Sequence, residues 1–239
     1  MTFGDVEAAC QSLRERLRES TEIILSEVSV ERPSDPEDEL HFVRLVAWGY
    51  VFLVEVASTP IRHIQTIIRG ADPIEHKKVA DAVRLVTNLR TYQAHQLSHD
   101  SSSDLDTKAN VSTWLAITDG DQPWPARIRL LCSSICEAIG AIVRKWEGLT
   151  AEETSRADAI DALRSAFDRQ WPPHLFDRFL EEAATELGIN GMDYPRYRGP
   201  RLSGWRKLAE CFQSRNDAEV ALKSAIRSDL RATFGQSPL

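Results

Sequence analysis

Residues 83–100 read VRLVTNLRTYQAHQLSHD, and this stretch decides how the chain folds. Apolar residues recur at intervals of three and four, from just before the stretch to its end, at Val79, Ala82, Val83, Val86, Leu89 and Leu97. This spacing is typical of a helix that packs one face into a core. The stretch therefore predicts a long helix inside a helical protein.

An arginine interrupts the apolar side of this helix. At roughly 100° per residue, Arg90 lies close to Val83 and Val86 around the helix axis. A permanent charge is costly among apolar side chains, so its guanidinium must be paired, extended to the rim of the helix or directed into a cleft. His95 and His99 follow, and on an ideal helix both project to a different side.

The rest of the chain predicts an all-α fold. Pro33 to Pro36, Pro60, Gly70, Gly188 and the segment DSSSDLD (100–106) read as breaks, and no strand pattern of convincing length appears. Apolar periodicity predicts helices over 3–30, 38–57, 61–70, 73–99, 107–118, 125–147, 152–167, 173–187 and 218–233. At 239 residues, the chain is long enough to bury a core without a cofactor or a disulfide.

The pattern of Arg90, four residues and His95, near the end of a long helix in an all-helical chain, resembles the signature of the HEPN superfamily of helical nucleases and nuclease-like proteins. Members commonly carry Asn, Asp or His after the arginine, where this chain has Thr91. The segment from Trp171 to Trp205, which contains PPHLFDRF, also resembles a region of bacterial HEPN-like proteins.

The resemblance implies a division of the chain and a reaction. It implies an up-and-down HEPN-like helical bundle over residues 1–148, which carries the motif, and a C-terminal helical extension over 149–239 packed on that bundle. Metal-independent RNA cleavage needs groups that move protons and a cation that stabilises the phosphorane, and histidine and arginine suit these tasks. We therefore expect Arg90 and His95 to be catalytic, with assistance from Asn88, Thr91, Tyr92, His99 and Glu55.

Glu55 has two interpretations. It closes the apolar run of the 38–57 helix, so it is the obvious partner for Arg90 if the two helices pack side by side. It can equally be an ordinary helix-end carboxylate that faces solvent, as most glutamates do.

The spacing of Arg90 and His95 presents a difficulty for a single chain. Five residues place the two side chains roughly 140° apart on an ideal helix, so one helix does not easily aim both at one phosphate. HEPN proteins typically dimerise so that two motifs face one cleft, and the resemblance therefore implies a homodimer. Residues 38–57, which are apolar nearly all round, are compatible with such an interface.

His95 and His99 also stand at the separation that lets two imidazoles reach one Zn²⁺. The residue after His95 is Gln96 where a metalloprotease has glutamate, and no third ligand is evident beyond Asp100. We expect no metal and no cofactor. A third interpretation treats both histidines as solvent-facing residues near a helix end.

A second basic segment lies near the C-terminus. Between Tyr194 and Lys207 no acidic residue interrupts the cations, and aromatic residues accompany them. Guanidinium groups bind phosphates and aromatic faces stack on unpaired bases, so RNA contacts are expected here, from Arg196, Arg198, Arg201, Trp205, Arg206 and Lys207. Alternatively, these arginines pair with the acidic helix residues Glu181, Glu182 and Glu186.

Charge and cysteine usage limit the setting. The net charge of −7 argues against capture of nucleic acid by a broad basic face, but it allows a local site. The four cysteines show no C-x-x-C spacing, nothing at the N-terminus resembles a signal peptide, and the longest apolar run is about half the ~20 residues of a membrane span. These features predict a cytoplasmic protein with no membrane partner.

Two functions therefore remain open. The first is a HEPN-type endoribonuclease of a bacterial antiphage-defence or toxin system, with an antitoxin or another defence protein as a partner. The second is a non-catalytic HEPN-like module that serves dimerisation or binds a partner protein.

Overall fold

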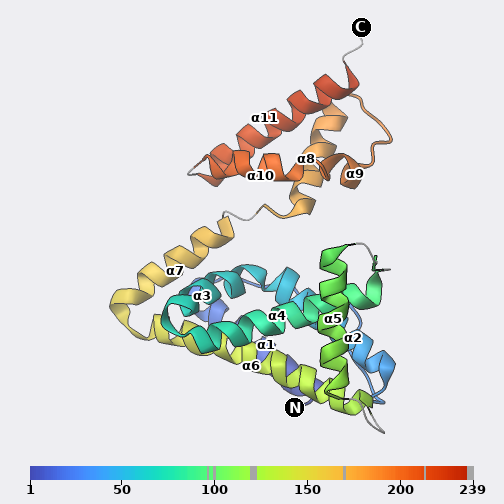
Figure 1. The fold of residues 1–239 in the computed structure, drawn as a ribbon. Coiled ribbons are helices and arrows are strands. Elements are labelled where there is room, and N and C mark those ends of the chain that lie inside the picture. The colour runs from blue at the N-terminus through green and yellow to red at the C-terminus, as the bar shows by residue number, and fades with distance from the viewer. Residues whose placement is uncertain (96, 99–100, 119–122, 169–170, 213, 236–239) are drawn as a thin grey trace. The chain divides into compact units, whose positions relative to one another are not determined.

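The computed structural model describes residues 1–95, 97–98, 101–118, 123–168, 171–212 and 214–235. Eleven α-helices and one π-helix, and no strand, are found in this part of the chain (Figure 1). The predicted all-α fold is therefore confirmed. The chain forms two compact units, Met1–Arg164 and Ser165–Leu239.

The division between the units differs from the expected one. We expected it after residue 148, but α6 continues without a break from Pro123 to Ala151. Gly148 is an ordinary residue of this helix, and a Cβ added to it would have no other atom within 4 Å. The division instead falls at Arg164 and Ser165, inside α7 (Glu153–Asp168).

The first unit is built around α4 (Pro73–Ala94), the helix that residues 83–100 predicted. Its buried side, with Val79, Ala82, Val86 and Leu89, packs against helices on several sides (Figure 1). Its neighbours are α2 (Glu39–Tyr50), the π-helix η1 (Val51–Val56), α3 (Ser58–Ala71), α5 (Ser102–Ala116) and α6. Helix α1 (Phe3–Thr21) packs along α6, and most of α7 also belongs to this unit.

Three helix ends differ from the expected ones. The first helix stops at Thr21 instead of residue 30, because Glu22 adopts the left-handed conformation (φ 62°) and its N–H bonds to the carbonyl of Arg18. The motif helix stops at Ala94, so His95 lies outside it. Most of the expected loop 100–106 belongs to α5, because the side chain of Ser101 caps that helix by accepting from the N–H of Asp104.

In the described part of the chain, no single helix has both the length and the apolar composition needed to cross a membrane. Only α2–η1 and α3 taken together pass that test, and the pair is bent by 75°.

Gly49 lets α2 approach α6 closely, and this predicts a measurable cost of enlargement. A Cβ at Gly49 would lie 3.0 Å from Cδ1 of the fully buried Ile135. We expect Gly49→Val to lower the free energy of unfolding by about 1–3 kcal/mol through overpacking. Gly148→Ala, in open space on α6, should instead raise it by roughly 0.5–1 kcal/mol. Urea unfolding followed by circular dichroism measures both, and equal effects would contradict this view of the α2–α6 contact.

The second unit contains α8 (Pro173–Glu186), α9 (Tyr194–Arg198), α10 (Leu202–Glu210) and α11 (Arg215–Phe234). Its core is separate from that of the first unit and includes Trp171, Phe176, Phe179 and Trp205. Phe176 stacks on Trp205, with ring centroids 5.7 Å apart. Gly188, with a φ of 70°, follows the end of α8 as the sequence predicted.

Candidate functional site

The candidate site lies where α4 ends. His95 is the residue after the last helical turn; its backbone is extended, and its N–H donates to the carbonyl of Thr91 at 3.1 Å. Its imidazole is exposed. Because His95 has left the helix, the angle of an ideal helix no longer fixes where its side chain points.

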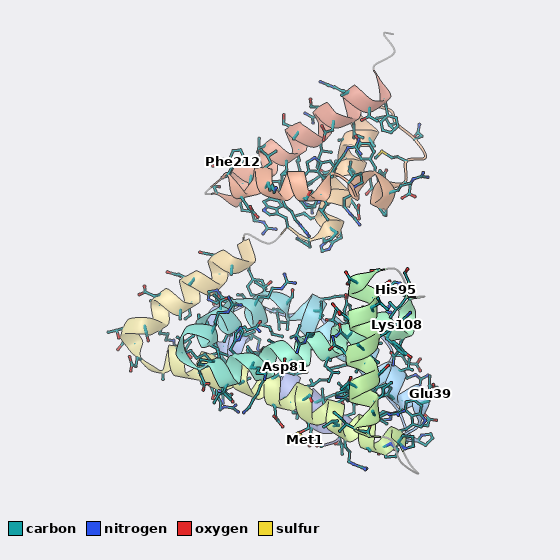
Figure 2. All side chains as sticks on the ribbon, viewed as in Figure 1. Met1, Glu39, Asp81, His95, Lys108 and Phe212 are labelled. Carbon is teal, nitrogen blue, oxygen red and sulfur yellow. The ribbon has the colours of Figure 1, made fainter. Side chains whose placement is uncertain are left out.

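The segment after His95 is held by the first turns of α5. Asp104 accepts from the N–H of Ser98 at 2.8 Å, and Lys108 Nζ donates to the carbonyl of Leu97 at 3.1 Å. Figure 2 shows His95 and Lys108 at the same end of the first unit. Asp104 and Lys108 were not predicted from the sequence, because no helical or strand periodicity links them to the motif.

Arg90 is half-buried, one residue beyond the buried Leu89. Its side chain forms no hydrogen bond or ion pair with any residue that the structure describes. Glu55 lies on η1, which packs against α4, but its carboxylate is exposed and does not pair with Arg90. Of the two interpretations of Glu55, the solvent-facing one therefore fits the structure, and the pair with Arg90 does not form.

The other candidates of the motif lie on the same two turns of α4. Asn88 and Thr91 are half-buried, and the ring of Tyr92 is 43% exposed. His99 lies outside the described residues. No side-chain hydrogen bond joins the described candidates to one another, and the backbone N–H of His95 donates to the carbonyl of Thr91.

Neither a metal nor a thiolate is indicated in the described residues. No group of three His, Cys, Asp or Glu side chains there could hold a metal ion, and the His95–His99 pair cannot be assessed because His99 is not described. Burial raises the pKa of Cys132 to about 12 and that of Cys136 to about 11. Both cysteines are therefore neutral thiols near pH 7 and poor nucleophiles.

Trp205 requires a correction. We expected it to stack on RNA, but its side chain is only 5% exposed and its indole N–H donates to Asp229 at 3.1 Å. It is a core residue of the second unit, on the inner side of α10. The sequence did not reveal that Trp205 is a core residue, because the basic residues next to it, Arg206 and Lys207, lie on the outer side of the same helical turn.

The arginines near Trp205 use partners that the sequence analysis did not anticipate. Arg198 pairs with Asp177, the Arg201 guanidinium lies 3.8 Å from the ring centre of Tyr197, and Arg206 donates to the carbonyl of Trp171. Two of the anticipated acidic partners bond elsewhere, since Glu182 pairs with Lys223 and Arg178, and Glu186 with Arg227.

Two cations of this segment remain available for an outside ligand. Arg196 and Lys207 are exposed, and neither forms a hydrogen bond or ion pair through its side chain with a described residue. The surface that Arg196 and Lys207 offer is smaller than the one expected from six residues.

Comparison of the chain with protein-family models, with curated proteins and with solved structures finds no match in any of the three. The fold and the site therefore define the protein by class: a two-unit, all-α protein in which a half-buried arginine, without a side-chain partner among the described residues, precedes an exposed histidine by five positions.

Proposed function

We propose that the protein is a metal-independent endoribonuclease of HEPN type that acts in a bacterial toxin or antiphage-defence system. The observation that supports this most is Arg90, a half-buried residue whose guanidinium has no hydrogen-bond or ion-pair partner among the residues that the structure describes. A cation that has lost part of its hydration without gaining an anionic partner destabilises the fold. Such a residue is more readily explained by an anionic ligand than by structure.

The proposed roles follow from side-chain chemistry. A histidine removes the proton from the ribose 2′-hydroxyl, whose oxygen attacks phosphorus and expels the 5′-oxygen. The 5′-oxygen takes up a proton, and the products are a 2′,3′-cyclic phosphate and a 5′-hydroxyl. Arg90 stabilises the charge of the phosphorane, because a guanidinium stays cationic and grips two oxygens.

Expression under tight induction tests this proposal. Wild-type protein should arrest growth and leave RNA fragments that end in 2′,3′-cyclic phosphate, and Arg90→Ala and His95→Ala should abolish both effects at equal protein level. Arg84→Ala and His174→Ala are matched controls, since Arg84 is an exposed residue of α4 that pairs with Asp81 and His174 lies on α8. Harmless wild-type protein with intact RNA, in the presence of its neighbouring genes, would overturn the nuclease proposal.

A second candidate function rests on a different feature, the outward side of α2 and η1. Leu40 and Val43 are exposed there, and Ala47, Tyr50 and Val54 continue the same stripe half-buried. The spacing of these five residues is the three-and-four repeat of a helix that packs against another helix. This stripe favours a module that associates with a protein, either a second copy or another partner.

A further inference from the structure

An acidic segment without helix or strand joins α1 to α2. Residues 22–37, called the acidic strap below, contain five acidic residues and one arginine. More than half of the net charge of −7 therefore lies in the acidic strap. The structure describes all sixteen residues, and Leu25 is the only one with a buried side chain. Four further apolar residues, Ile23, Val28, Val30 and Pro33, are half-buried, and most of the other side chains of the acidic strap are exposed to solvent.

Arginines of the helices hold the acidic strap. Arg14 of α1 pairs with Glu27 at 2.7 Å and donates to the carbonyl of Ser26 at 2.8 Å. Arg44 of α2 pairs with Glu31 at 2.7 Å and donates to the hydroxyl of Ser34. Three further ties complete the attachment: Arg32 of the acidic strap pairs with Glu7 of α1 at 2.5 Å, His41 Nδ1 lies 3.0 Å from the carbonyl oxygen of Ser34, and Glu37 lies 4.0 Å from Arg129 of α6.

Burial is unequal within the pairs that Arg14 and Arg44 form. The side chains of Arg14 and Arg44 are 15% and 24% exposed, whereas those of Glu27 and Glu31 are 89% and 71% exposed. The Arg14 guanidinium also lies 5.5 Å from the ring centre of the fully buried Phe52. The arginines are therefore fixed parts of the helix surface, and the carboxylates approach from the solvent side. Ion pairs with so exposed a partner are weak and sensitive to salt.

A hollow adjoins one of these pairs. It has a volume of about 340 Å³ and lies between α1, the acidic strap and α2, with Cys10, Arg14, Glu27 and Trp48 in its wall. The volume lies within the range of small-ligand sites, roughly 300–1,000 Å³. Arg14 is the only cation among the residues that line it.

We propose that the acidic strap covers a phosphate-binding surface formed by Arg14 and Arg44, and that single-stranded RNA displaces it. An extended backbone with negative charges at intervals has the form of a single nucleic-acid strand, and guanidinium forks bind phosphate as well as carboxylate. The proposal rests on the proposed function only for the choice of RNA. RNA binding can be measured in a variant that does not cleave RNA, so the displacement proposal and the nuclease proposal can fail separately.

The test measures the binding of a short, unstructured, fluorescein-labelled RNA by fluorescence polarisation in a His95→Ala background. Glu27→Gln/Glu31→Gln/Glu37→Gln neutralises the acidic strap and should tighten the Kd about tenfold at about 50 mM salt, with a smaller gain at 200 mM. The control Glu15→Gln/Asp106→Asn/Asp158→Asn removes the same charge from exposed positions outside the acidic strap. It should change the Kd much less, and an equal gain would overturn the proposal.

Two further variants separate displacement from charge. Leu25→Ser removes the buried apolar attachment of the acidic strap but no charge, and should tighten the Kd in the same direction. In the neutralised variant, Arg14→Gln/Arg44→Gln should cancel the gain, while Arg16→Gln/Arg84→Gln, at exposed helix positions, should leave it. Circular dichroism checks that each variant is folded. If Arg14→Gln/Arg44→Gln does not fold, Arg14→Lys/Arg44→Lys replaces it in the same measurement. A gain that survives loss of Arg14 and Arg44, or no gain at all, would overturn the proposal.

Discussion

Replacement of Phe176 by alanine is expected to destabilise the second unit strongly while the stability of the first unit stays unchanged. Phe176 is fully buried, and its ring contacts Trp171, Phe179 and Trp205. Truncation of a buried phenylalanine costs about 3–5 kcal/mol. A unit of about 75 residues has a total stability of roughly 4–11 kcal/mol, so this loss removes much of what holds it folded.

Limited proteolysis with mass spectrometry measures the effect on each unit. Cleavage sites should appear within residues 165–239 of Phe176→Ala, and urea unfolding should show two transitions of which only one has moved. Phe212→Ala is the matched control, because Phe212 belongs to the same unit but is exposed. A single transition that shifts as a whole would show that the two units unfold together.

The existence of most helices could be predicted from the sequence, and their ends could not. The 3.6-residue period identified α7, α8 and α11 to within a few residues, because a buried stripe must recur at that interval. The ends of α1 and α4 were missed, since glycine commonly marks a helix end and here Glu22 and His95 end them. A glutamate at positive φ leaves no signal in the sequence.

The candidate site was predictable to the extent that it depends on one helix. The position of Arg90 beside Val83 and Val86 follows from helical spacing, and the structure places Arg90 half-buried. Its pairing depended on whether a side chain of another helix reached it, and helical spacing does not determine this. For this reason the sequence left two interpretations of Glu55 open, and the ties of Asp104 and Lys108 to residues 98 and 97 were not foreseen.

A heterodimer of Arg90→Ala and His95→Ala chains is expected to regain activity that neither variant has alone. Each substitution should lower the cleavage rate by about 10²–10⁴-fold, the range for loss of a general acid–base group. The proposed HEPN-type function implies a dimer in which the motifs of two chains face one cleft, so we expect each cleft to take Arg90 from one chain and His95 from its partner. Such a heterodimer has one cleft with both side chains and one with neither.

Two affinity tags, one on each chain, allow the heterodimer to be purified after co-expression. It should cleave RNA at about half the wild-type rate, because one of two symmetric clefts is complete. If both residues acted from the same chain, every cleft of the heterodimer would lack one group and no activity would return. Light scattering measures whether the purified protein is a dimer. A heterodimer of Arg84→Ala and His95→Ala chains, purified with the same two tags, is the control for effects of the tags and of chain exchange. A monomer that cleaves RNA at the wild-type rate would contradict the shared cleft, because one chain would then supply both groups to one phosphate.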